Sequence, residues 1–232
     1  MDEAARWAAE GAPHGALVVA EHQHGGRGRH GRAWVGAPGQ SLLFTLVLHP
    51  TLPLERAGLL PLAAGLAVAE AVEAFGVAAS VKWPNDVRVD GRKLAGVLAG
   101  ARGGRVLLGV GLNAGQSSFP PELADVATSL RLETGQPVDR LAPLAPVLRR
   151  LEERLGQAAS APDRLVAAVE GRMEAVGTAV AVQDPGSGRT LHRGTVLGLA
   201  PDGALRLATA AGETAIYAGE VTLGASVGAA GG

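Results

Sequence analysis

The pattern of apolar residues changes at Gly177, and this change constrains the fold more than any other feature of the sequence. Before it, apolar runs of strand length alternate with longer segments of helical spacing. After it, short strand-like runs are separated by Gly, Pro and Asp, which is typical of a small β-barrel or sandwich. The sequence therefore predicts an α+β domain over residues 1–176, a small β-domain over 177–224 and a disordered tail over 225–232.

Periodicity and turn residues locate the expected elements in both parts. The expected helices cover 2–11, 54–76, 139–156 and 162–176, with one short helix inside 120–135. The expected strands cover 16–21, 41–49, 80–83 and 105–112, and then 178–182, 190–199, 204–208, 213–217 and 220–223.

A β-hairpin is predicted with its turn at Asp90–Gly91, because Asp-Gly between two strand-like runs is a strong hairpin signal. Since side chains alternate between the two faces of a strand, Asp86 and Lys93 should lie on one face as diagonal neighbours. The opposite face should be apolar and hold Val87, Val89 and Leu94. The expected partners are Val89 with Arg92, Arg88 with Lys93, Val87 with Leu94, and Asp86 with Ala95.

Composition excludes several classes of protein. The chain has no cysteine, so it has no disulfide, thiolate zinc site or cysteine nucleophile. Its formal net charge of −1 argues against a dedicated nucleic-acid-binding protein. The start is not a signal peptide, and the longest apolar run, Leu59–Ala69, is too short to span a bilayer, so we expect a cytoplasmic protein without membrane contact. His22, His24 and His30 have only Glu21 as a nearby carboxylate, so no metal site is predicted.

The segment Gly25–Arg32 combines glycines with three arginines, and Trp34 follows shortly after. Glycine lets the backbone approach a ligand closely, and guanidinium groups bind carboxylate or phosphate oxygens in pairs. The segment is therefore a candidate site for a small anionic ligand. A solvated basic loop and a nucleic-acid-binding segment remain alternatives.

The sequence Lys82-Trp83-Pro84-Asn85-Asp86 leads directly into the predicted hairpin. An ammonium and a carboxylate on one strand face can serve adenylyl or phosphoryl transfer, because the ammonium neutralises phosphate charge. The alternative is an ordinary surface salt bridge. Lys82 and Lys93 are the only lysines of the chain, beside 19 arginines, which indicates that a compact charge is needed at these two positions.

A further candidate lies at the end of the strand predicted over 105–112. Gly109 and Gly111 leave room for a ligand against the backbone, and Asn113 can bind an adenine edge through paired hydrogen bonds. A strand that simply ends in an Asn-capped turn is the alternative.

Taken in order, these motifs resemble the catalytic domain of biotin–protein ligases. The resemblance is carried by Ala20-Glu21-His22-Gln23, GGRGRHGRAW, KWPND, RKLAGVLAG and GVGLN. The segments His192–Val196, Asp202–Leu205 and Ala218–Val221 resemble the C-terminal module of that family. The resemblance implies a class II synthetase-like mixed β-sheet with helices on one side, followed by an SH3-like β-barrel.

The resemblance also implies a two-step reaction. Biotin attacks the α-phosphate of Mg·ATP to form biotinyl-AMP, and a lysine of a biotin carboxyl carrier protein then takes the biotin. Lys93, Asp86 and Arg29 are the expected catalytic residues, and the arginine-rich loop is expected to cover the adenylate. The resemblance implies biotin or adenylate contacts for Gln23, Arg27, Gly28, Arg29 and Lys93, nucleotide contacts for Arg29, Arg32, Lys82, Asn85 and Asn113, and further ligand contacts for Trp83, Gly96 and Gly111.

Two features of the resembling family are expected to be missing. No DNA-binding helix-turn-helix fits before Ala16, so we expect no repressor role and no DNA partner. The family's strand with Ser-Thr-Asn, which helps to hold the biotin rings, would precede Asp2–Ala9. Either the start codon is misassigned, or the sequence is shortened, or the affinity for biotin is weak. A homodimer is possible. The alternatives are a lipoate or octanoate ligase or transferase of related fold, a biotin-binding remnant without catalysis, and a nucleic-acid binder.

Overall fold

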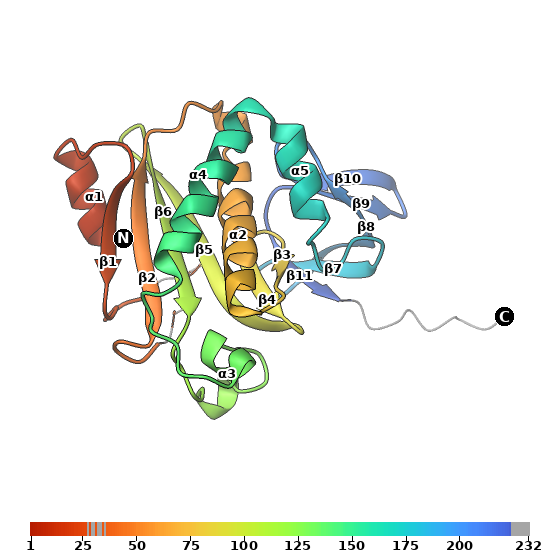
Figure 1. The fold of residues 1–232 in the computed structure, drawn as a ribbon. Helices are drawn as coiled ribbons and strands as arrows, with labels where there is room; N and C mark the ends of the chain where they lie inside the picture. The colour runs from red at the N-terminus through yellow and green to blue at the C-terminus, as the bar shows by residue number, and fades with distance from the viewer. Residues whose placement is uncertain (27, 29–30, 32–33, 35, 224–232) are drawn as a thin grey trace.

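The computed structural model describes residues 1–26, 28, 31, 34 and 36–223 (Figure 1). A six-stranded sheet has the order β1-β2-β6-β5-β4-β3, and a five-stranded sheet has the order β10-β9-β8-β7-β11. The strands of the first sheet are β1 (Ala16–Ala20), β2 (Ser41–Leu48), β3 (Ser80–Lys82), β4 (Asp86–Val89), β5 (Arg92–Arg102) and β6 (Arg105–Asn113). Those of the second are β7 (Ala179–Gln183), β8 (Thr190–Leu199), β9 (Leu205–Thr209), β10 (Gly212–Ile216) and β11 (Glu220–Leu223).

The helical elements confirm the predicted α+β class. The α-helices are α1 (Asp2–Ala9), α2 (Leu59–Ala71), α3 (Leu130–Thr134), α4 (Leu144–Ser160) and α5 (Pro162–Glu170), and the 3-10 helices are η2 (Leu54–Arg56), η3 (Val72–Phe75) and η4 (Pro121–Leu123). The strand ladders are antiparallel, and parallel pairing among the described residues is limited to single bridges such as Val81 with Met173. The expected mixed sheet is therefore antiparallel along its ladders.

The predicted helices have different bounds in the structure. The helix predicted over 2–11 ends at Ala9, and the one predicted over 54–76 consists of α2 flanked by the 3-10 helices η2 and η3. The helix predicted over 139–156 begins later, at Leu144, and continues to Ser160. Pro146 fits its first turn, where no backbone donor is needed, and Pro162 follows its end. The helix predicted over 162–176 ends at Glu170, because the chain then leaves the helix to pair Met173 with Val81 of β3.

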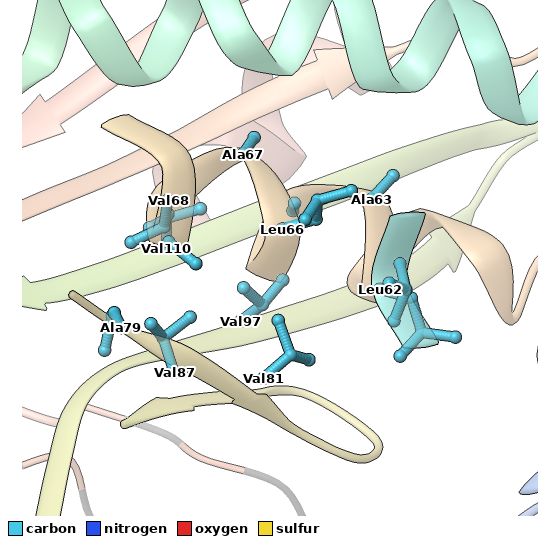
Figure 2. Packing of buried hydrophobic residues seen from close by; sticks show 14 of the residues in the cluster. Leu62, Ala63, Leu66, Ala67, Val68, Ala79, Val81, Val87, Val97 and Val110 are labelled. Carbon is cyan, nitrogen blue, oxygen red and sulfur yellow. The ribbon is translucent and has the colours of Figure 1, made fainter. Parts of the chain in front are cut away.

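Helix α2 lies at the centre of the core. It is apolar on all sides, which requires burial all round. Figure 2 shows Val87 and Val97 pointing from the sheet toward α2, while Ala63 and Ala67 point toward α4. The segment Leu54–Phe75 is long and apolar enough to span a membrane by composition alone, but 67% of its most apolar window is buried inside the structure, as in a core helix.

Leu66 tests the role of α2 in stability, because its side chain is fully buried in the core. We expect Leu66→Ala to lower the free energy of unfolding by about 2–5 kcal/mol, through lost apolar burial and the cavity that remains. Urea unfolding measures this change. Leu54→Ala is the matched control, because Leu54 is 80% exposed and its truncation should change stability by less than about 0.5 kcal/mol.

The two faces of the six-stranded sheet are covered differently. Leu46 and Leu108 belong to the core beneath α2, whereas Val47 and Leu107 pack with Ala4 of α1. Since neighbouring residues of a strand point to opposite faces, α1 lies on the face opposite α2. The expectation of helices on one side therefore holds for α2, α4 and α5 but not for α1. Beyond α1, this second face is open to a cavity.

The hairpin forms at Asp90–Gly91 as predicted, with a change of register further along. Val89 pairs with Arg92 and Arg88 with Lys93, but a bulge between Val87 and Arg88 then shifts the partners. Asp86 faces Gly96 instead of Ala95, and Val87 faces Ala95 instead of Leu94. The bulge lets both Leu94 and Ala95 enter the core, where each is fully buried. The predicted apolar face of Val87, Val89 and Leu94 is confirmed.

Candidate active site

A cavity of about 930 Å³ lies on the sheet face opposite α2. Its floor comes from side chains that alternate with the core residues, such as Leu43 and Thr45 of β2 and Leu98 of β5. Gly96, Gly109 and Gly111 lie on the same face and carry no side chain to fill it. The hollow therefore follows from strand alternation together with glycines at facing positions of β5 and β6.

The cavity brings together most of the residues predicted from the motifs. Segments from the first loop, the KWPND turn, the hairpin and β6 all meet there, although they are far apart in the sequence. The predicted residues that line it are Gln23, Gly28, Lys82, Trp83, Asn85, Asp86, Lys93, Gly96 and Gly111. Arg27, Arg29, Arg32 and His30 lie outside the described residues.

The Lys93 ammonium and the Asp86 carboxylate form an ion pair in the cavity wall, with 2.7 Å between Nζ and Oδ1. Both side chains are half-buried. The bulge places Asp86 opposite Gly96, but Lys93 still pairs with Arg88, two residues after Asp86. Asp86 and Lys93 therefore remain diagonal neighbours, as expected from the hairpin. Nζ also lies 5.6 Å from the centre of a Trp34 ring. Of these groups, the Lys93 ammonium is the one that can neutralise phosphate charge.

The backbone of Lys93 is held independently of its side chain. Its amide donates to the Val126 carbonyl over 2.8 Å, and its carbonyl accepts from the Thr128 amide over 2.9 Å. These bonds join β5 to the loop before α3. The ammonium is therefore carried on a fixed backbone position.

Asn113 occupies a different place from the other predicted residues. Its side chain is only 4% exposed and lies outside the cavity lining. Its amide nitrogen donates to the carbonyl of Thr128 over 3.0 Å and to that of Lys93 over 3.4 Å, and its oxygen accepts from the Gln116 amide over 3.1 Å. In this arrangement Asn113 supports Lys93 from behind.

Lys82 lies beside Asp86 because the two residues pair across β3 and β4. Burial is the main cause that lowers the pKa of Lys82, and the charge of Arg88 adds to it. The carboxylates of Asp86 and Glu220 act in the opposite direction. Asp86 is thus placed between two lysines, both of which line the cavity.

Trp34 explains why glycine is required at two floor positions. A Cβ atom on Gly111 would lie 2.8 Å from the Trp34 ring, and one on Gly96 would lie 3.2 Å from the ring and 3.1 Å from Cε of Lys93. A side chain at Gly111 would therefore force the indole to move. The sequence motifs indicate Trp34 only as a neighbour of the arginine-rich loop.

Other cavity residues were not predicted to lie at the site. Met1, Asp2 and Glu3 reach it from α1, and Gly219 and Glu220 reach it from the start of β11. The last two are more than 100 residues from the KWPND turn. No local motif predicts a meeting between such distant segments.

Two family models match the chain. Residues 4–117 match the Biotin/lipoate A/B protein ligase family, and residues 175–224 match the Biotin protein ligase C terminal domain. The Biotin–[acetyl-CoA-carboxylase] ligase of Paracoccus denitrificans is 35% identical over 223 residues, covering 90% of each chain. The Bifunctional ligase/repressor BirA of Bacillus subtilis is 34% identical over 227 residues, covering 92% of this chain and 67% of that protein.

Solved structures show the same fold. The biotin protein ligase from Aquifex aeolicus in complex with biotin and ATP superposes with a TM-score of 0.83 at 33% identity, covering 95% of this chain and 94% of that one. The second matched family model is specific to biotin ligases, whereas the first also includes lipoate enzymes. Together with the cavity and its lysine–aspartate pair, these matches show that this chain belongs to the biotin protein ligase family.

Proposed function

We propose that this chain forms biotinyl-AMP from biotin and ATP and then transfers biotin to a lysine of a biotin carboxyl carrier protein. The observation that carries the proposal is the Lys93–Asp86 pair in the wall of a 930 Å³ cavity, in a fold shared with a ligase that binds biotin and ATP. The apolar floor around Leu43 and Leu98 suits the biotin ring system and its aliphatic chain.

In the first step, a carboxylate oxygen of biotin attacks the α-phosphorus of Mg·ATP, and the bond to the β-phosphate oxygen breaks. Pyrophosphate leaves. The Lys93 ammonium neutralises charge on the α-phosphate and the acyl oxygens as it builds up. Lys82 and Asn85 lie further along the same wall, where they can hold the nucleotide.

In the second step, the amine of the carrier lysine attacks the biotinyl carbonyl carbon, and AMP leaves with the electrons of the broken C–O bond. The amine must lose a proton. Asp86 is suitably placed to accept it once Lys93 has turned toward the phosphate, and Lys82 then remains beside the carboxylate. Alternatively, the Asp86 carboxylate would hold the Mg²⁺ that accompanies the nucleotide, and this ion would neutralise phosphate charge.

We assign the remaining roles as follows. Gln23, Arg27, Gly28 and Arg29 bind biotin or the adenylate, and Arg29 and Arg32 face the nucleotide. Gly96, Gly111 and Trp83 shape the site. For Asn113 we propose support of the Lys93 carbonyl in place of a direct contact with the nucleotide. The chain is proposed to act in the cytoplasm, where its carrier would be found.

Exchange of labelled pyrophosphate into ATP tests the first step. We expect exchange that depends on biotin and is absent with lipoate. Transfer of labelled biotin to a purified biotin carboxyl carrier domain tests the second step. Exchange with lipoate but not with biotin would identify a lipoate ligase. Biotin binding without exchange would identify a non-catalytic binding protein.

A further inference from the structure

A buried hydrogen bond joins the KWPND turn to the C-terminal β-sheet. Nε1 of Trp83 donates to the carbonyl of Gly203 over 3.0 Å. Trp83 is only 4% exposed, and the two residues are 120 positions apart. A buried carbonyl and a buried indole N–H each need a partner, so each of these groups depends on the other.

The turn that carries Gly203 fits closely against the start of α2. Residues 200–204 join β8 to β9, and the Gly203 amide closes this turn by donating to the Ala200 carbonyl over 2.8 Å. Gly203 has a φ of +89°, and a Cβ atom there would lie 3.1 Å from Leu62 and 3.2 Å from the backbone of Gly58. A Cβ atom on Gly58 would lie 2.9 Å from the Asp202 carbonyl. Both glycines therefore let the turn approach the helix.

The KWPND turn is held from its other side by β5. Nδ2 of Asn85 donates to the Val97 carbonyl over 2.7 Å, and the Val97 amide donates to the Asn85 carbonyl over 2.9 Å. The turn is thus clamped between β5 and residues 200–204. Lys82 and Asn85, the proposed nucleotide-binding residues, flank Trp83 within this clamp.

We propose that Gly203 is a positioning residue for the nucleotide end of the site. Its carbonyl holds the Trp83 indole and thereby sets where Lys82 and Asn85 stand in the cavity wall. The inference rests on the proposed function, and it gives residues 200–204 of the C-terminal sheet a defined task in the reaction. Biotin is held mainly by other segments, so the effect should be confined to ATP.

Trp83→Phe tests this directly, because it removes the N–H donor and keeps most of the ring. We expect the KM for ATP to rise about tenfold, while the Kd for biotin, measured by calorimetry without ATP, stays within about twofold. A side chain that only filled the core would change stability and leave the ratio of the two constants unchanged. Trp7→Phe is the matched control, because Trp7 lies on α1 outside the cavity lining.

Gly203→Ala should break the same hydrogen bond from the acceptor side, because it displaces the Gly203 carbonyl and leaves the Trp83 N–H in place. It should therefore also raise the KM for ATP. Gly212→Ala controls for backbone strain, because Gly212 has a φ of +112° and a Cβ atom there meets nothing within 4 Å. If Trp83→Phe and Gly203→Ala break the same contact, the double variant should raise the KM for ATP no more than the stronger single variant does.

The outcomes separate the two proposals. If the unmodified chain forms no biotinyl-AMP, the proposed function fails. If it is active, and folded Trp83→Phe protein keeps its KM for ATP, the inference about Gly203 is wrong. Additive effects in the double variant, or equal losses of biotin and ATP affinity, would also overturn it.

Discussion

Replacing Lys93 with alanine is expected to slow biotinyl-AMP formation about 10³-fold while the protein stays folded. The rate should fall because alanine removes the ammonium that is proposed to neutralise charge on the α-phosphate. The fold should persist because the bonds from Lys93 to Val126 and Thr128 come from its backbone, which alanine retains. A half-buried ion pair contributes little stability by itself. Single-turnover formation of biotinyl-AMP and thermal unfolding measure the two effects.

Two further variants sharpen this test. Lys93→Arg should not restore the rate, because a planar guanidinium cannot replace a compact charge next to Gly96 and Trp34. Arg206→Ala is the matched control, since Arg206 of β9 forms a 2.6 Å ion pair with Glu213 of β10, and neither residue lines the cavity. A near-normal rate for Lys93→Ala would remove Lys93 from the mechanism.

Asp86→Asn is expected to slow transfer from the adenylate to the carrier lysine about 100-fold, because an amide cannot accept the proton of the amine. Formation of the adenylate should fall less than about tenfold, since Lys93 remains. The two half-reactions are measured separately, by loading the enzyme with biotin and ATP and then adding the carrier domain. Glu213→Gln, which alters the surface pair, serves as the control.

The alternative role of Asp86 makes a different prediction. If the carboxylate organises Mg²⁺, adenylate formation should fall more than transfer, and more Mg²⁺ should be needed for half-maximal rate. A transfer rate that stays normal in Asp86→Asn would exclude the role of proton acceptor.

Local sequence patterns were sufficient for most elements of the fold. The predicted strands 190–199 and 220–223 coincide with β8 and β11. Each strand lies between turn residues, whose local backbone preferences are enough to end a strand. The Asp90–Gly91 turn and the pairing of Asp86 with Lys93 were also predictable, since both depend on residues fewer than ten positions apart. Most of the residues that the motifs singled out also meet in the cavity.

Only the tertiary structure decided the rest. The bulge beside Val87 arises because Leu94 and Ala95 are both drawn into the core, which no strand alternation reveals. Asn113 was expected to contact the ligand. Its side-chain amide instead forms hydrogen bonds with Thr128 and Gln116, outside the cavity lining. Periodicity indicates which residues share a face within one helix or strand. The bulge beside Val87 and the position of Asn113 depend instead on packing between segments far apart in the chain. That packing exists only once the sheets have assembled.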